Sequence, residues 1–154
     1  MFTDIVGSTA RAAELGDAAW ARLLERHDSV VAAEVERHGG WLVKSLGDGA
    51  LALFDRPSRA IACAIAAREQ VRGLGLETRS GLHTGECELL AGSEVGGIAL
   101  HIGARISALA GGGEILASGT VRDLTLGSPF TLTDRGEHLL KGMPEPWRVF
   151  ALSG

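Results

Sequence analysis

The chain has 154 residues, which is enough for one compact domain with its own hydrophobic core and too few for two domains of ordinary size. Hydrophobic residues at 45% and charged residues at 22% fit a soluble globular protein. The formal net charge of −4 argues against binding nucleic acid through bulk positive charge, so an anionic ligand would have to be met by local groups.

Cysteine usage and hydropathy indicate a cytoplasmic location. Cys63 and Cys87 lack the spacing of metal ligands and are too few for a disulfide scaffold, which favours a reducing compartment. No apolar stretch approaches the roughly 20 residues of a membrane span, and no basic-then-apolar leader precedes the first strand. We therefore expect a cytoplasmic protein, or a cytoplasmic domain of a longer one, with no direct membrane insertion and no nucleic-acid partner.

The N-terminal third predicts a strand, a long helix and a hairpin. Phe2–Val6 reads as a short strand of the buried type, and apolar residues recur at helical spacing from about Asp17 to His38. The apolar runs Trp41–Leu46 and Ala50–Phe54 flank Gly47-Asp48-Gly49, whose composition is typical of a hairpin with positive φ at its turn.

The rest of the chain predicts two longer helices and several short elements. Ala60 to about Val71 is an alanine-rich helix suited to close packing on a sheet, and apolar residues from Ile98 to Leu109 mark one stripe of another helix. The other predicted elements are strands at Thr78–His83, Glu86–Leu90, Glu114–Ala117, Glu137–Leu140 and Trp147–Leu152, and a short helix at about Thr120–Leu124.

The order of these elements predicts the fold class. A β-α-β-β-α-β order with C-terminal strand additions indicates a ferredoxin-like α+β sandwich, with helices on one face of a mostly antiparallel sheet. We expect residues 1–154 to form a single domain. Because Met1 stands directly before a strand, this domain is also compatible with excision from a longer protein that carries an upstream regulatory domain.

Two aspartates stand where the predicted strands would bring them together. Asp4 ends the first strand, and Asp48 lies at the tip of the hairpin. Two carboxylates at one sheet edge repel each other, but hard divalent cations with phosphate oxygens accept both as ligands. Gly7, Ser8 and Thr9 follow Asp4 and would present backbone N–H groups near a helix start, which suits a phosphate. Each aspartate taken singly also suits an ordinary turn, so a purely structural role stays open.

Five stretches spread over the whole chain carry a specific family resemblance. They read FTDIVGST, KSLGDGALALF, SGLHTGECEL, GGIALHIGARISALAGGGEILAS and DRGEHLLKGMPEPWRVFAL. In this order they resemble the catalytic domains of the class III nucleotidyl cyclases, most of all the bacterial and mycobacterial members. The resemblance implies a homodimer with active sites at its interface, which uses two metal ions to convert ATP or GTP into the 3′,5′-cyclic monophosphate and pyrophosphate.

The same resemblance assigns the metal ligands. It implies that Asp4 and Asp48 bind two divalent ions per site, Mg²⁺ or Mn²⁺, with the backbone carbonyl of Ile5 as a further ligand. One ion would make the ribose 3′-oxygen more nucleophilic and the other would neutralise the pyrophosphate leaving group, so the chemistry requires no protein general base.

Base recognition is assigned to a lysine and a glutamate. Lys44 lies within an apolar run and matches the family lysine that donates to adenine N1, although an edge-strand lysine with no ligand would look similar. Glu94 occupies the partner position, where the family usually has aspartate or threonine, and its carboxylate would accept from the adenine amine. This pair favours ATP over GTP. Glutamate is one methylene longer than aspartate, which would shift the acceptor by about an ångström.

Three further side chains are expected at the phosphates and the ribose. His101 and Arg105 lie four residues apart on the predicted third helix and therefore share a face. By resemblance, Arg105 stabilises the charge of the five-coordinate α-phosphate, and His101 orients the ribose in place of the usual asparagine. Lys141 in LLKG matches the family lysine that reaches the terminal phosphates.

The sequence also favours a dimer with shared sites. Lys44 and Asp48 lie on one short hairpin, yet the base and the phosphates of a nucleotide are separated by a ribose, so one hairpin serves one nucleotide poorly. Two-fold pairing would let one subunit supply the carboxylates and the other supply Lys44, Glu94, His101 and Arg105.

The leading prediction is an adenylyl cyclase catalytic domain. The alternative is a catalytically weak or inactive cyclase-homology domain that dimerises and regulates. A diguanylate cyclase ranks last because the hairpin reads Gly47-Asp48-Gly49, without the Gly-Gly-Asp/Glu-Glu-Phe signature.

Overall fold

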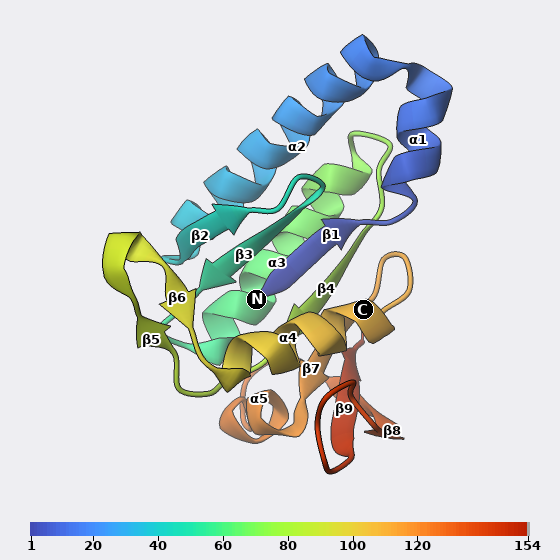
Figure 1. The fold of residues 1–154 in the computed structure, drawn as a ribbon. Coiled ribbons are helices and arrows are strands. Elements are labelled where there is room, and N and C mark those ends of the chain that lie inside the picture. The colour runs from blue at the N-terminus through green and yellow to red at the C-terminus, as the bar shows by residue number, and fades with distance from the viewer. Residues whose placement is uncertain (154) are drawn as a thin grey trace.

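A computed structural model describes residues 1–153 (Figure 1), and its centre is a seven-stranded mixed sheet. The strand order is β2-β3-β1-β4-β7-β9-β8, and β4 and β7 form the parallel pair while the other neighbours are antiparallel. The strands are β1 Phe2–Ile5, β2 Trp41–Ser45, β3 Gly49–Leu53, β4 Thr78–Leu82, β7 Ile115–Ser118, β8 Leu132–His138 and β9 Trp147–Leu152.

Helices and a small hairpin surround this sheet. The helices are α1 Ser8–Leu15, α2 Asp17–Arg37, α3 Pro57–Arg72, α4 Ile98–Leu109 and α5 Gly119–Leu124. The hairpin consists of β5 Glu88–Leu89, the 3₁₀ helix η1 Ala91–Ser93 and β6 Val95–Gly96. Among the helices of residues 1–153, none combines the length and the apolar character that a bilayer crossing requires.

The order β2-β3-β1-β4 confirms the predicted ferredoxin-like arrangement, and β7, β9 and β8 are its C-terminal additions. Helices α2 and α3 cover one face of this unit, and their alanines and valines form the larger core with β1, β3 and β4. Helix α4 crosses the other face in front of β4 and β7 (Figure 1) and forms a second core with β7 and β9. Side chains alternate between the two cores along β7, where Ile115 faces the first and Leu116 the second.

Glycine at position 81 of β4 permits the close approach of α4. A Cβ atom built on Gly81 would lie 2.3 Å from the backbone nitrogen of Ser107 and 2.7 Å from the carbonyl oxygen of Gly103. The helix therefore lies almost directly on the strand, which fixes the position of every α4 side chain relative to the sheet.

Several elements differ from the prediction. Helix α1 was not predicted as a separate element; it has only eight residues, and none of them is buried. Strand β8 begins at Leu132 and ends at His138, whereas the predicted strand was Glu137–Leu140; pairing with β9 holds its polar first half in place. The strand predicted at Glu86–Leu90 is shortened to the two residues of β5.

Candidate active site

The two aspartates singled out in the sequence line one cleft, Asp4 from strand β1 and Asp48 from the turn just before β3. Asp4 on β1 is in register with Gly49 of β3, and the N–H of Ile5 donates to the carbonyl of Asp48 at 2.9 Å. A Cβ atom on Gly49 would lie 3.0 Å from the Cβ of Asp4 and 2.5 Å from the carbonyl oxygen of Thr3, so glycine is needed for this close packing. The cleft has a volume of about 290 Å³ and also includes residues of α4 in its wall.

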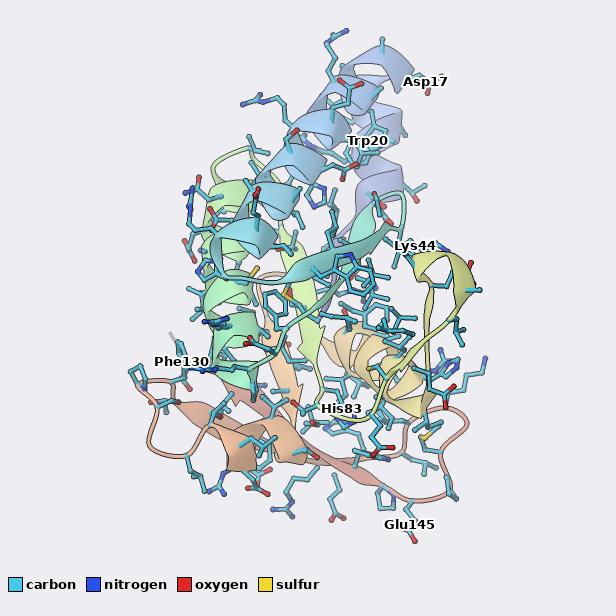
Figure 2. All side chains as sticks on the ribbon, turned by 90° about the vertical axis from the view of Figure 1, so that its left-hand side faces the viewer. Asp17, Trp20, Lys44, His83, Phe130 and Glu145 are labelled. Carbon is cyan, nitrogen blue, oxygen red and sulfur yellow. The ribbon has the colours of Figure 1, made fainter. Side chains whose placement is uncertain are left out.

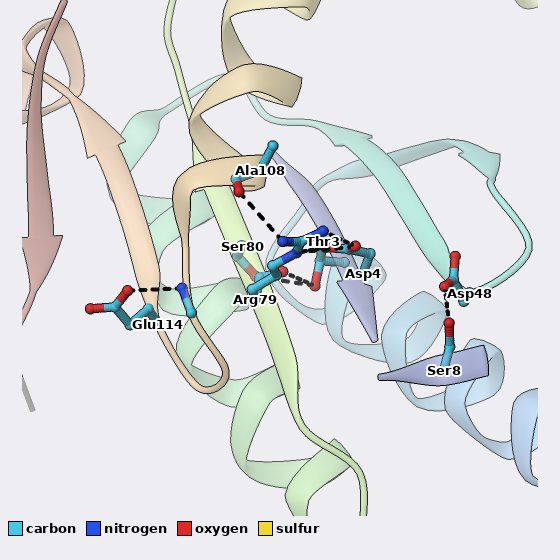
Figure 3. Close-up of polar contacts among 9 residues, drawn as sticks. Thr3, Asp4, Ser8, Asp48, Arg79, Ser80, Ala108 and Glu114 are labelled. Atoms are coloured by element: carbon cyan, nitrogen blue, oxygen red, sulfur yellow. Dashed lines mark hydrogen bonds and ion pairs between the residues drawn. The ribbon is translucent and has the colours of Figure 1, made fainter. Parts of the chain in front are cut away.

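An arginine holds the first aspartate. Arg79 on β4 faces Asp4 across the β1–β4 pair, and its Nε donates to Oδ1 at 2.9 Å and to Oδ2 at 3.2 Å, while Nη2 donates to Oδ2 at 3.0 Å (Figure 3). The hydrogen bonds to Asp4 raise the pKa of Arg79, and the negative charges of Asp4 and Asp48 act in the same direction. The guanidinium is therefore charged and neutralises one of the two carboxylates.

A serine at the start of α1 holds the second aspartate. The hydroxyl of Ser8 donates to Oδ2 of Asp48 (Figure 3). Gly7 stands just before α1 with φ of 68°, a left-handed conformation that glycine adopts at little cost, and it turns the chain from β1 into the helix. The first backbone N–H groups of α1, including those of Ser8 and Thr9, have no partner within the helix by geometry. Residues 7–9 thus bring N–H donors to the edge of the carboxylate cleft.

The residues present fit the divalent ions that the fold family implies. The cleft is lined by two carboxylates and a single cationic side chain, Arg79, so its side chains carry a net charge of −1. Carboxylate and carbonyl oxygens are the donors that Mg²⁺ and Mn²⁺ prefer. Within residues 1–153 no cluster of three or more His, Cys, Asp or Glu side chains forms, so Asp4 and Asp48 would complete such a site with backbone, solvent or phosphate oxygens.

Lys44 lies on the outermost strand β2 (Figure 2) and is exposed. The β2–β3 register shifts between Leu42, which pairs with Ala52, and Lys44, which pairs with Leu51. This irregularity gives β2 one extra residue, which is the property of a β-bulge. Because Leu51 also pairs with Phe2, Lys44 faces the side of the sheet that carries Phe2 and Asp4.

The other predicted residues lie outside the cleft. Glu94 is exposed at the end of η1, and Lys141 is exposed in the loop between β8 and β9. His101 and Arg105 are exposed on α4, whereas Ala104, Ser107 and Ala108 are the residues of this helix that line the cleft. One copy of the chain therefore brings together Asp4, Asp48 and residues 7–9, but leaves these four side chains facing solvent.

Arg79 was not among the site residues predicted from the sequence. The available signal was a charged residue at the second position of the predicted strand Thr78–His83, but its partner Asp4 is 75 positions away in the chain. His83, at the end of the same predicted strand, has structural contacts: its Nδ1 lies 2.8 Å from Oγ of Ser118, and its ring packs edge-on against Trp147 at a centroid distance of 5.3 Å. Burial lowers the pKa of His83, which favours the neutral ring.

Sequence comparison finds an uncharacterized mycobacterial relative. No family model matches the chain. The chain is 35% identical over 130 residues to the uncharacterized protein Rv0891c of Mycobacterium tuberculosis, and the match covers 81% of this chain and 45% of that protein. The chain thus spans less than half the length of this curated relative.

Solved structures give the fold family. The adenylyl cyclase CyaB from P. aeruginosa matches with a TM-score of 0.91 at 23% identity, over 99% of this chain and 91% of that one. The guanylate cyclase domain of RhGC from Catenaria anguillulae, solved in complex with GTP, matches with a TM-score of 0.86 at 18% identity, over 99% and 93% of the two chains. The protein is therefore an α+β domain with the fold of nucleotide cyclases. More specifically, it has the catalytic-domain fold of the class III adenylyl and guanylyl cyclases, as its motifs predicted.

Proposed function

We propose that this chain is the catalytic domain of an adenylyl cyclase, which converts ATP into 3′,5′-cyclic AMP and pyrophosphate in the cytoplasm. The observation that carries the proposal is the cleft in which Asp4 and Asp48 meet beside the N-terminus of α1. A net negative cleft next to the backbone N–H groups of a helix start suits a nucleotide that arrives with divalent cations.

In this proposal Asp4, Asp48 and the carbonyl of Ile5 hold two Mg²⁺ or Mn²⁺ ions. Bound there, such ions supply a more nucleophilic ribose 3′-oxygen and a neutralised pyrophosphate leaving group. The backbone N–H groups of residues 7–9 bind the phosphates and hold the α-phosphate in line with the 3′-oxygen. Positioning of this kind accounts for most of the catalysis expected in phosphoryl transfer.

Base selection is proposed to rest on Lys44 and Glu94. Lys44 would donate to adenine N1 and Glu94 would accept from the adenine amine, whereas guanine presents a carbonyl and an N–H in the reverse order. The chain is similar in fold to both adenylyl and guanylyl cyclases, so the proposed preference for ATP over GTP depends on these two side chains. The exposure of both fits a role in which they meet a nucleotide held by another copy.

The second copy is the partner that the exposed residues require. His101 and Arg105 share the solvent face of α4, and Ile98 and Leu109 on the same helix are 59% and 42% exposed. Apolar side chains exposed on both sides of a functional pair are typical of an interface. We propose a homodimer in which Arg105 stabilises the α-phosphate charge, His101 orients the ribose and Lys141 reaches the terminal phosphates of a nucleotide bound to the partner's carboxylates.

The first test is product analysis with ATP and GTP in parallel, in the presence of Mn²⁺ or Mg²⁺. We expect cyclic AMP from ATP and at least tenfold slower turnover of GTP. Asp4→Ala and Asp48→Ala should abolish turnover while circular dichroism and the melting temperature show a folded domain. Equal turnover of ATP and GTP would refute the roles of Lys44 and Glu94.

The second test addresses the shared sites. Asp48→Ala and Arg105→Ala subunits should each be inactive alone, and mixing them should restore one complete site in each heterodimer. If heterodimers form without any recovery of activity, the shared-site model is wrong.

A cyclase-homology domain without turnover is the second candidate, because Glu94 and His101 depart from the usual aspartate or threonine and asparagine. It predicts nucleotide binding and dimerisation with no cyclic product, and the same product analysis separates it from an active enzyme.

A further inference from the structure

Arg79 is the charged residue of the cleft to which the reaction above gives no role. Its guanidinium donates to both carboxylate oxygens of Asp4, and its Nη1 also donates to the carbonyl of Ala108 in the last turn of α4 at 3.4 Å. The side chains of Arg79 and Asp4 are 34% and 31% exposed, so the pair is half-buried at the wall of the cleft. This arrangement fixes Asp4 between β1, β4 and α4.

The guanidinium contacts both oxygens of the carboxylate that is proposed to bind metal. Nε approaches both oxygens of Asp4 and Nη2 approaches one of them, which is the bidentate arrangement that carboxylates also offer to a cation. A divalent ion on the same carboxylate would stand within a few ångströms of the positive guanidinium and be repelled by it. The two cations therefore compete for Asp4.

The charges of the cleft explain why the cationic side chain of Arg79 is bound there. Only Asp4, Asp48 and Arg79 carry charge among the residues that line the cleft. Without Arg79, the cleft would hold two carboxylates and no cation, and Ser8 donates to only one oxygen of Asp48. In the absence of metal, the guanidinium of Arg79 reduces the repulsion between the carboxylates of Asp4 and Asp48.

We propose that Arg79 is a built-in counter-ion of the metal site, which occupies Asp4 in the metal-free protein and must leave it when a divalent ion binds. The proposal rests on the metal-binding role proposed above for Asp4. Arg79 is thereby a positioning residue that keeps Asp4 ordered and sets how tightly the site takes metal before the nucleotide arrives.

The test measures Mn²⁺ binding in the absence of nucleotide, by loss of the free-ion electron paramagnetic resonance signal. Arg79→Gln removes the competing charge, so we expect it to bind Mn²⁺ two- to fivefold more tightly than wild type. Arg135→Gln is the matched control, because Arg135 also pairs with a carboxylate, Glu114, at 2.8 Å but lies outside the cleft. The control should bind Mn²⁺ like wild type.

Thermal melting gives a second readout. Without metal, Arg79→Gln should melt below wild type because its two carboxylates repel, and saturating Mn²⁺ should raise its melting temperature more than that of wild type. Unchanged or weaker Mn²⁺ binding by folded Arg79→Gln would overturn the proposal. If wild type itself bound no Mn²⁺, the proposed metal-binding role of Asp4 and Asp48 would be wrong as well. Failure of the Arg79 proposal alone is therefore distinguishable from failure of the proposed metal site.

A measurement on wild type covers the case in which Arg79→Gln does not fold. In ¹⁵N-labelled protein, the Nε–H resonance of Arg79, assigned by its absence in Arg79→Lys, should shift when Mg²⁺ saturates the site. A resonance that stays in place at saturation would show that Arg79 keeps Asp4, and the proposal would be wrong.

Discussion

The contact between β4 and α4 gives the most direct structural prediction. In Gly81→Ala, the new methyl group would stand 2.3 Å from the backbone nitrogen of Ser107, whereas ordinary contacts begin at 3.4 Å. The neighbouring atoms are backbone and cannot rotate away, so α4 must move by about 1 Å. Overpacking of this kind costs about 1–3 kcal/mol of the free energy of unfolding. For a domain of this size that corresponds to a fall in melting temperature of about 2–12 °C.

The same displacement should reach the proposed reaction, because α4 carries His101 and Arg105. A misplacement of about 1 Å can reduce turnover on the order of a hundredfold. Thermal melting and cyclic-nucleotide production should therefore both fall in Gly81→Ala. Gly119→Ala is the matched control: its methyl group would meet its nearest neighbours at 3.8 and 3.9 Å, at the first residue of α5. If Gly81→Ala has the melting temperature and the turnover of wild type, this reasoning is wrong.

Two further predictions concern titratable groups. Burial lowers the pKa of His83 below its usual 6.5. Near and below pH 6.5, His83 is therefore protonated more often in the unfolded chain than in the native protein. The free energy of unfolding should fall as pH drops from about 7.5 to 5.5. His83→Gln should show a flatter dependence in urea titrations at these two pH values, and an equally steep dependence would contradict the assignment. Burial also raises the pKa of Cys63 to about 12, whereas Cys87 is exposed. A thiol reagent should therefore label one cysteine quickly in the native protein, Cys87, and the second only after unfolding; rapid labelling of both would contradict the buried position.

The sequence predicted the elements whose pattern depends on burial. Helix α2 was expected at about Asp17–His38 and is observed at Asp17–Arg37, because its apolar residues recur on the face that packs on the sheet. Helix α1 has only eight residues, fewer than the roughly 11 over which periodicity identifies a helix, and none of them is buried. Strand β8 is an edge strand of mostly exposed residues, and its position depends on pairing with β9 rather than on its own composition.

The candidate site could be predicted in part for the same reason. Asp4 and Asp48 follow local signals, a charge in an apolar strand and the tip of a glycine hairpin, and strand adjacency is enough to bring them together. Arg79 approaches Asp4 only because β1 and β4 pair across a separation of 75 residues, which no local pattern contains. Contacts that depend on the pairing of strands far apart in the chain cannot be predicted from local sequence patterns.

The β-bulge in β2 determines which face of the sheet carries Lys44. In a regular strand the pairing of Leu42 with Ala52 would be followed by Val43 opposite Leu51, and Lys44 would then point into the core with Ala50. The extra residue instead places Lys44 opposite Leu51, on the face that carries Asp4. A charged side chain within an apolar run is thus kept out of the core by one residue of register. The same shift puts the proposed base-recognition lysine on the face of the sheet where a second copy of the chain would present its nucleotide.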